Sequence, residues 1–327
     1  MNMYRVLFFA PRSGFRADEL MNATFGELVD NDKVEYFKGH YNYKLLPLPF
    51  RFLAYLLTTE TLIKRFKIPK FIVKYFSKYL YLNDYNFEKG IKYIILVSEL
   101  ATRNTNDLEV FNKKTQGYLK VCYFFDTVVN YSNTKDLIDM WEFDKVLSFS
   151  KKDSEKFNFI FYPTPISKVK IIDNPYYDLS FVGEYKPIRE KYISKFKYYI
   201  GNDEFYVFIP KSRLSTEYSK KWKKHSEYMD IVSKSNCLLE IGRTNDLAPT
   251  LRFYEAIIYN KKLITNLNSV KKMPYYNPKY VKVIETVENI NPALIKWINK
   301  KEDVDYGYRG EFSPNKLINY LIDNFSK

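Results

Sequence analysis

The chain has 327 residues, of which 46% are apolar and 28% are charged, and 52 Lys and Arg against 38 Asp and Glu give a formal net charge of +14. This composition is typical of a globular protein, and with only 10 Gly and 14 Pro it excludes a disordered or collagen-like chain. Cys122 and Cys237 are the only cysteines, and His40 and His225 the only histidines, which excludes a Cys/His zinc site and fits a reducing compartment.

The first half of the chain predicts a parallel sheet. Apolar runs at residues 4–10, 91–97, 118–125 and 145–149 have the pattern of buried strands, and polar, helix-like segments separate them. Strands that alternate with helices favour parallel pairing in an α/β domain. We therefore expect an N-terminal α/β domain over residues 1–165.

Residues 43–82 interrupt this pattern with eight basic residues and one acid, Glu60. Apolar residues recur at helical spacing over residues 68–80, which predicts a basic amphipathic helix. Such a helix lies on an anionic bilayer surface, although a helix packed on the domain with its lysines in water gives the same pattern. The lysines on its polar side are Lys67, Lys70, Lys74 and Lys78.

The second half repeats the alternation of strands and helices. Three prolines cluster in residues 162–176, where apolar periodicity is weak, so we place the domain boundary there. This gives a C-terminal domain over residues 176–312 and a C-terminal helix over residues 313–327, with packing back onto the N-terminal domain as one option. The expected strands are 178–182, 205–209, 236–241 and 262–265, and the expected helices are 187–198, 250–260 and 314–325.

The most informative segment is residues 237–266, which combines a buried strand, a polar loop, a helix and another strand. The free N–H groups and dipole at the helix start form an anion site. Thr250 and Arg252 add a hydroxyl and a guanidinium that suit phosphate, whereas Glu255 would repel phosphate and suits sugar hydroxyls. Together they predict a ribose-diphosphate site. The alternative is a solvated Glu255 paired with Arg252 on the helix surface.

This segment, CLLEIGRTNDLAPTLRFYEAIIYNKKLITN, resembles the donor site of GT-B glycosyltransferases of bacterial lipopolysaccharide and capsule synthesis, and DLSFVGEYKPIR at residues 178–189 resembles the opening of their C-terminal domain. The resemblance implies that Glu255 binds ribose. Arg243 stands where the better-known retaining members have the first Glu of a pair, which leaves the retaining or inverting outcome open. The other donor residues that it implies are Gly183, Arg189, Arg243, Thr250, Leu251 and Arg252.

The resemblance also implies a fold and an activity. The fold is GT-B, two Rossmann-like domains whose parallel sheets face a central cleft. The activity is transfer of a sugar from a nucleotide diphosphate-sugar, a UDP-sugar foremost, to a lipid-linked or glycan acceptor of bacterial surface polysaccharide. Positive side chains and a helix dipole would stabilise the leaving diphosphate, so we expect no metal and no other cofactor.

Sugar transfer needs a base for the acceptor hydroxyl. Asp126 follows the strand at residues 118–125, in the sequence YFFDTVVN, and is the first candidate. Asp18 and Glu19, which follow the first strand, come next, and Glu99 comes after them. Each of these acids could instead cap a helix.

Two other functions stay open. One is a nucleotide-sugar 2-epimerase of similar fold, which would need acids and a histidine around the sugar ring. The other is a non-enzymatic basic protein that binds nucleic acid or anionic lipid, although no nucleic-acid motif stands out and we expect no such partner. The longest apolar run, residues 52–57, is far shorter than the roughly 20 residues of a membrane span. We expect a cytoplasmic protein, peripheral on the inner face of the membrane.

Overall fold

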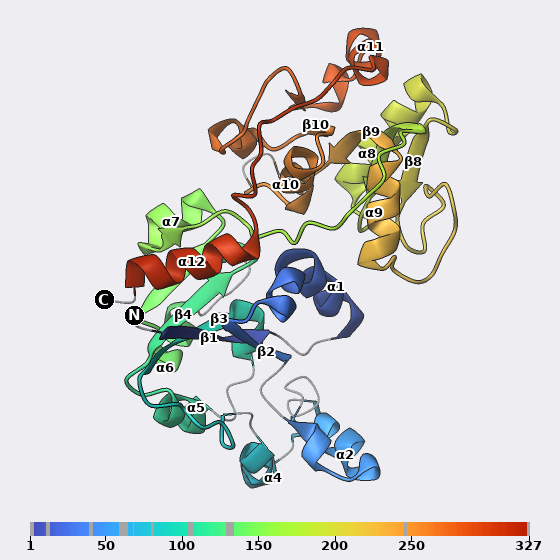
Figure 1. The fold of residues 1–327 in the computed structure, drawn as a ribbon. Coiled ribbons are helices and arrows are strands. Elements are labelled where there is room, and N and C mark those ends of the chain that lie inside the picture. Colours follow the sequence, from blue (N-terminus) through green and yellow to red (C-terminus); the bar gives the residue numbers. More distant parts are fainter. Residues whose placement is uncertain are drawn as a thin grey trace. The chain divides into compact units, whose positions relative to one another are not determined.

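The chain forms two compact units in the computed structural model (Figure 1). Unit 1 comprises Met1–Met21, Gly26–Pro163 and Asn315–Lys327, and unit 2 comprises Asn22–Phe25 and Thr164–Pro314. Each unit is built on one parallel sheet. The structure describes residues 3–10, 14–38, 42–58, 65–67, 69–79, 82–103, 108–128, 134–244 and 247–325.

Unit 1 contains a six-stranded sheet in the order β2-β1-β3-β4-β5-β6, and every pairing is parallel. The central strands are nearly continuous apolar runs because helices cover parallel sheets on both faces. The strands are β1 Met3–Ala10, β2 Val34–Lys38, β3 Ile91–Ser98, β4 Leu119–Phe124, β5 Lys145–Ser148 and β6 Ile160–Phe161. The helices are α1 Gly14–Phe25, α2 Leu48–Thr58, α4 Lys70–Tyr75, α5 Leu108–Lys114, α6 Thr134–Trp141, α7 Lys151–Phe157 and α12 Pro314–Phe325.

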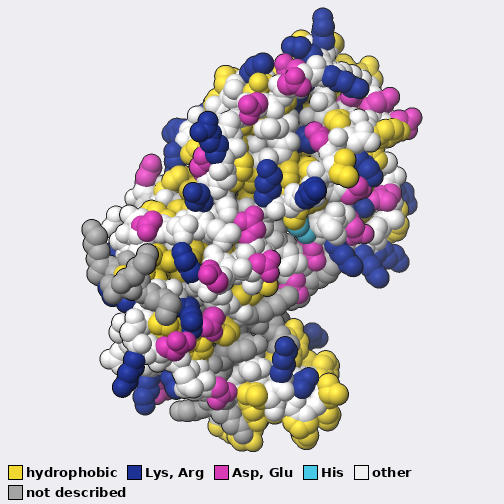
Figure 2. Space-filling view, viewed as in Figure 1, with side chains coloured by type: hydrophobic (Ala, Val, Ile, Leu, Met, Phe, Trp, Pro, Cys, Tyr) yellow, Lys and Arg dark blue, Asp and Glu magenta, His cyan; other side chains and the backbone are white. Residues whose placement is uncertain are grey.

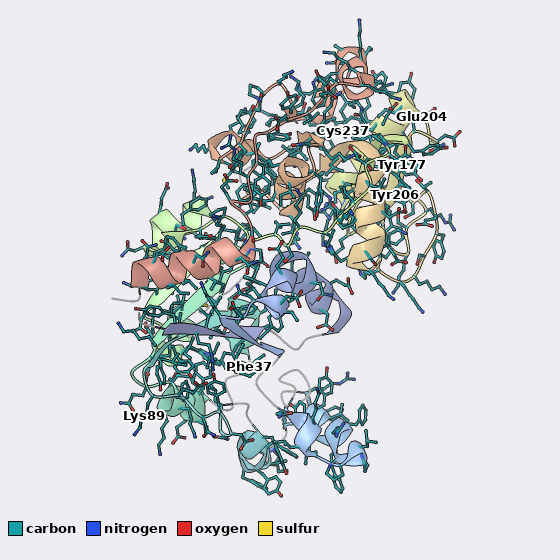
Figure 3. All side chains as sticks on the ribbon, viewed as in Figure 1. Phe37, Lys89, Tyr177, Glu204, Tyr206 and Cys237 are labelled. Carbon is teal, nitrogen blue, oxygen red and sulfur yellow. The ribbon has the colours of Figure 1, made fainter. Side chains whose placement is uncertain are left out.

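Unit 2 contains a five-stranded parallel sheet in the order β11-β10-β9-β7-β8. Figure 3 labels Tyr177, Tyr206 and Cys237, which lie on β7, β8 and β9, three of the five strands, and the two tyrosine rings lie 5.0 Å apart. The strands are β7 Tyr177–Val182, β8 Phe205–Phe208, β9 Ser235–Glu240, β10 Lys262–Thr265 and β11 Val281–Val283. The helices are α8 Pro187–Ile200, α9 His225–Ser233, α10 Leu251–Ile258 and α11 Pro292–Asn299.

These two sheets with their helices confirm the predicted class of two Rossmann-like domains. All eight predicted strands are present, but β2, β6 and β11 were missed. All three lie at sheet edges. An edge strand is covered less completely, and β2, with the sequence VEYFK, has one buried residue and otherwise half-buried ones among those described.

The prediction of one continuous amphipathic helix over residues 68–80 is wrong. Lys67 adopts a left-handed backbone with φ 48°, α4 spans only Lys70–Tyr75, and a 3₁₀ turn follows at Phe76–Tyr79. Pro69 explains the break, because a proline disfavours the helical conformation of the residue before it. Lys67 is exposed, and the side chains of Lys70, Lys74 and Lys78 lie outside the described residues.

Helix α12 belongs to unit 1 although unit 2 precedes it in the chain. Leu317, Ile318 and Leu321 of this helix are fully buried, and the ring of Tyr320 lies 5.1 Å from that of Tyr162. Among the helices that the structure describes, none is long and apolar enough to cross a bilayer.

Candidate functional site in unit 2

Two glycines mark the carboxyl ends of β7 and β9, the edge where parallel α/β sheets bind ligands. Gly183 follows β7, and a Cβ there would lie 2.8 Å from Cζ of Phe181. Gly242 follows β9, and a Cβ there would lie 2.3 Å from Cδ2 of the buried Leu267. The Gly242 N–H donates to Oδ1 of Asn266 at 2.7 Å. Only glycine fits at Gly242 without movement, so the backbone itself forms this surface.

The start of α10 is fastened to the end of β9. Thr250 caps the helix, and both its N–H and its hydroxyl donate to Oε1 of Glu240, at 2.7 and 2.6 Å. Glu240 is 1% exposed, and its Oε2 has no hydrogen bond among the described residues. Burial raises the pKa of Glu240, while the hydroxyls of Thr250 and Thr265 pull it down.

Arg189, in the first turn of α8, ties two loops together. Its Nε donates to the carbonyl of Ile241 and its Nη1 to the carbonyl of Glu184, both at 2.8 Å. Burial lowers the pKa of Arg189 to about 10, and the charges of Arg252 and Arg243 add to the effect. A guanidinium so placed fixes the loops after β7 and β9 and contributes a positive charge between them.

Arg252, in the first turn of α10, is held by aromatic rings. Its guanidinium carbon lies 5.7 Å from the ring centre of Phe181 and 5.6 Å from that of Tyr228. Such contacts stabilise a cation without using its N–H groups. Among the described residues the guanidinium has neither a hydrogen bond nor an ion pair, so its five donors stay available for a ligand.

Glu255 lies one turn further along α10 and is 3% exposed. The hydroxyl of Tyr228, on α9, donates to its Oε2. Burial raises the pKa of Glu255, and the charge of Arg252 and the bond from Tyr228 lower it. The alternative of a solvated surface Glu255 is therefore wrong. Tyr228 contacts Arg252 with its ring and Glu255 with its hydroxyl, so one side chain orients both.

The remaining predicted donor residues lie around this cluster. Arg243 is exposed and adds its charge near Arg189, and Leu251 is the half-buried first residue of α10. Sequence reasoning missed four residues of the site. The missed residues are Phe181, Tyr228, Glu240 and Asn266. A carboxylate at the end of an apolar strand could have indicated Glu240, whereas no local pattern indicates the other three.

The carboxylates predicted as bases lie in unit 1. Asp126 is exposed after β4 and its Oδ1 accepts the N–H of Thr127 at 2.8 Å. Buried Glu99 accepts the N–H of Phe125 at 3.1 Å, and buried Asp153 accepts the N–H of Val128 at 2.9 Å. These two carboxylates fix the loop that presents Asp126.

Asp18 and Glu19 are half-buried on α1. Burial, and then the nearby charge of Asp18, raises the pKa of Tyr36 on β2 to about 12. The structure thus places Asp18 beside β2, while Asp126 follows β4, two strands beyond β1 in the sheet.

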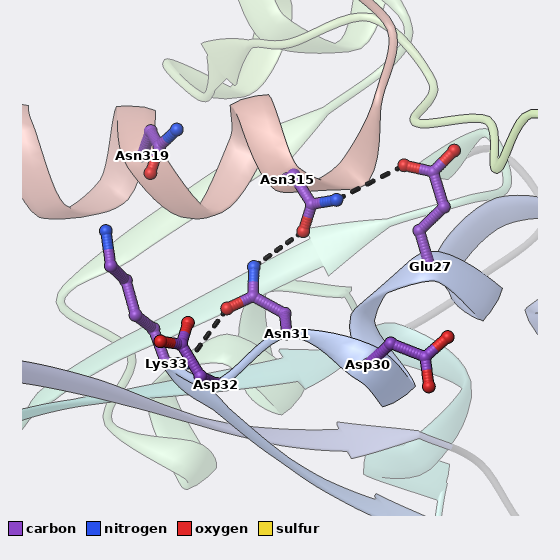
Figure 4. Close-up of a pocket in the computed structure, with 7 residues that line it drawn as sticks. All are labelled: Glu27, Asp30, Asn31, Asp32, Lys33, Asn315 and Asn319. Atoms are coloured by element: carbon purple, nitrogen blue, oxygen red, sulfur yellow. Dashed lines mark hydrogen bonds between the residues drawn. The ribbon is translucent and has the colours of Figure 1, made fainter.

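A polar pocket of about 510 Å³ contains the Asp30-Asn31-Asp32 stretch at the amino end of β2 (Figure 4). Asn31 donates to Asn315 at 2.6 Å, and Asn315 donates to Glu27 at 3.3 Å, which fastens α12 to unit 1. Within the described ranges, no group of three or more His, Cys, Asp or Glu side chains is arranged to hold a metal. The hydrogen bonds of Asn315 to Asn31 and Glu27 in this pocket hold α12 on unit 1.

No family model and no curated protein matches the chain. Among solved structures, an alpha-glucosyltransferase in complex with UDP and a mismatched 13-mer DNA aligns over 99% of this chain and 100% of its own, at 10% identity and TM-score 0.55. A UDP-N-acetylglucosamine 2-epimerase aligns over 100% of this chain and 98% of its own, at 9% identity and TM-score 0.51. At such identities the similarity shows the fold, and it confirms the GT-B class that the sequence resemblance implied.

Proposed function

We propose that this protein is a glycosyltransferase that uses a nucleotide diphosphate-sugar, with a UDP-sugar as the first candidate. The observation that carries the proposal is the Arg252 guanidinium, which two aromatic rings hold and which makes no hydrogen bond or ion pair among the described residues. Arg189 and Arg243 add like charges that repel Arg252, and binding of an anion would relieve this repulsion. A diphosphate fits this site because guanidinium groups and a helix start both bind phosphate oxygens.

The same groups would act on the leaving diphosphate. As the bond between the anomeric carbon and the diphosphate oxygen breaks, negative charge grows on the diphosphate. Arg252 and the N–H groups at the start of α10 are already in place to stabilise it, so no reorganisation is needed. Glu255, oriented by Tyr228, accepts hydrogen bonds from the ribose hydroxyls. This reaction uses no metal and no other cofactor.

Asp126 is the proposed base for the acceptor. It takes the proton of an acceptor hydroxyl while that oxygen bonds to the anomeric carbon. Asp126 suits the role because it is exposed on a loop that Glu99 and Asp153 fix, and Asp18 is the second candidate. The sequence resemblance supports a lipid-linked or glycan acceptor of bacterial lipopolysaccharide or capsule synthesis, at the inner face of the cytoplasmic membrane.

The first test is nucleotide binding by calorimetry with UDP, GDP, dTDP and ADP. We expect one nucleoside diphosphate to bind, and Arg252→Ala to weaken it about 10- to 100-fold, because bonds to a charged group are worth about 1.5–3 kcal/mol. Arg252→Lys keeps the charge and loses the two-pronged geometry, so its loss should be intermediate. Arg309→Ala removes an exposed arginine of unit 2 and is the matched control. Unchanged affinity in Arg252→Ala would refute the proposed donor site.

The second test separates transfer from the 2-epimerase alternative. With the preferred UDP-sugar, a transferase releases UDP in proportion to added acceptor, whereas an epimerase interconverts the sugar without an acceptor. Interconversion without net release of UDP would replace the proposal.

A further inference from the structure

Helix α2 presents an apolar outer face to solvent. Of the sixteen large apolar side chains that are exposed in the described chain, eight lie within residues 45–75. Figure 2 shows this region as a largely hydrophobic surface with Lys and Arg among it, at the lower right where Figure 1 places α2. We call the α2 surface the exposed residues Leu48, Phe50, Phe52 and Leu53 of α2 with Phe71 and Tyr75 of α4.

The opposite side of α2 is already packed. Ala54 is fully buried in a small core with Tyr43 and Phe76. Nine of the eleven α2 residues are apolar, and its one charged residue, Arg51, donates to the carbonyls of Leu46 and Lys44 at 2.7 and 2.9 Å. A helix that is apolar all round needs cover on both sides, and contiguous apolar patches of this kind mark binding surfaces.

The charge around this surface identifies what covers it. Residues 43–79 contain eight Lys and Arg and one acid, Glu60, so the segment carries 8 − 1 = +7. Two copies joined through this surface would bring two such charges together, which disfavours self-association. An anionic bilayer offers the complement, because acyl chains take up the apolar side chains and lipid phosphates meet the Lys and Arg.

We infer that the α2 surface inserts into the headgroup region of an anionic lipid bilayer, with the exposed Lys44, Arg65 and Lys67 at the lipid phosphates. The inserting side chains belong to α2 as well as to α4, whereas the sequence predicted only the basic helix over residues 68–80. The inference goes beyond the donor site, which lies in unit 2, and lipid binding can be measured without any sugar.

The experiment is co-sedimentation of the full chain with vesicles of phosphatidylglycerol and phosphatidylcholine, and of phosphatidylcholine alone. We expect binding to the anionic vesicles that weakens at high salt and falls at least about tenfold in the Phe52→Ser/Phe71→Ser variant, which loses two inserting rings. The matched control is Ile172→Ser/Tyr198→Ser, which removes side chains that are 84% and 80% exposed elsewhere. Its binding should stay within about twofold of the wild type.

Three outcomes would overturn the inference. They are no binding of the wild type to anionic vesicles, equal binding of the Phe52→Ser/Phe71→Ser variant, and a wild-type dimer that this variant abolishes without any vesicle binding. Circular dichroism and thermal unfolding, measured on every variant, show that each is folded. Vesicle binding without any nucleotide binding would refute the proposed function and leave this inference standing.

Discussion

The carboxyl edges of the two parallel sheets differ in the charges that they carry and in how those charges are used. In unit 2, Arg189, Arg243 and Arg252 gather at the ends of β7 and β9, and the guanidinium of Arg252 has no hydrogen-bonded partner among the described residues. In unit 1, Glu99 and Asp153 are buried and bonded to backbone N–H groups. Unit 2 also has a buried carboxylate of this kind, Glu240, which accepts the N–H of Thr250. The difference between the two edges is therefore the arginine cluster of unit 2.

The two units use the residues at their strand ends in different ways. A cluster of like charges stabilised by aromatic rings is completed by a ligand of opposite charge. Carboxylates that accept backbone N–H groups fix a loop, and Asp126, the proposed base, is the exposed acid of that loop. The fold alone decides neither property, because both depend on residues at strand ends and in the following loops. We expect unit 2 to determine donor affinity and unit 1 to determine the rate of transfer.

Substitution of Asp126 should separate these two roles. Asp126→Asn should lower kcat by about 10²- to 10⁴-fold, the usual contribution of a general base. UDP affinity should not change, because the proposed donor residues all lie in unit 2. The Asn side-chain oxygen can still accept the Thr127 N–H, so the loop keeps its conformation. Steady-state release of UDP and calorimetry measure the two quantities.

The control for this variant is Asp203→Asn, which neutralises an exposed acid of unit 2. Full turnover in Asp126→Asn would remove Asp126 as the base and make Asp18→Asn the next variant. A fall in UDP affinity would contradict the division between the units.

A smaller effect tests whether Tyr228 orients the ribose ligand. Tyr228→Phe keeps the ring beside Arg252 and removes the hydroxyl that donates to Glu255. Loss of one such hydrogen bond costs about 1 kcal/mol, or about fivefold in affinity. We expect that loss for UDP, and a smaller loss for 2′-deoxy-UDP, whose sugar offers Glu255 one hydroxyl fewer. Equal losses for the two nucleotides would mean that Glu255 does not contact the 2′-hydroxyl.

Much of the fold follows from the sequence because parallel strands that helices cover on both faces must be apolar throughout. Residues 91–97 form such a run, and β3 is buried except for one lysine. Strand β2 has no such run because it lies at the sheet edge, and only pairing with β1 defines it. At residues 68–80, apolar periodicity predicted one continuous helix, but Pro69 interrupts it.

The candidate site divides in the same way. Thr250, Arg252 and Glu255 could be predicted because one loop and one helix start bring them together. Tyr228 could not, because α9 places it against α10 across 27 residues of sequence. Phe181 likewise meets Arg252 only through the packing of β7 beside the helix start. Site residues that lie on one loop and the following helix start can thus be predicted from the sequence, whereas residues that tertiary packing brings to them cannot.

The smallest expected effect is a change of pH dependence at Glu240. Burial raises the pKa of its carboxyl, so the folded chain holds a proton at pH values where the unfolded chain has released it. Between those two pKa values the unfolded state binds fewer protons, and the free energy of unfolding therefore falls as the pH rises. The side chain in Glu240→Gln cannot ionise, and its amide oxygen can still accept from Thr250. We therefore expect the free energy of unfolding of this variant, measured in urea, to change less with pH.

The UDP affinity of the wild type should also fall as the pH rises, because an ionised Glu240 beside Thr250 would repel the diphosphate. Arg252 opposes the rise by favouring the charged carboxylate, so Arg252→Ala should steepen the fall in stability. Identical pH profiles for the wild type and Glu240→Gln would show that the buried carboxyl keeps one protonation state throughout, and the contrast between the two sheet edges would then rest on the arginines alone.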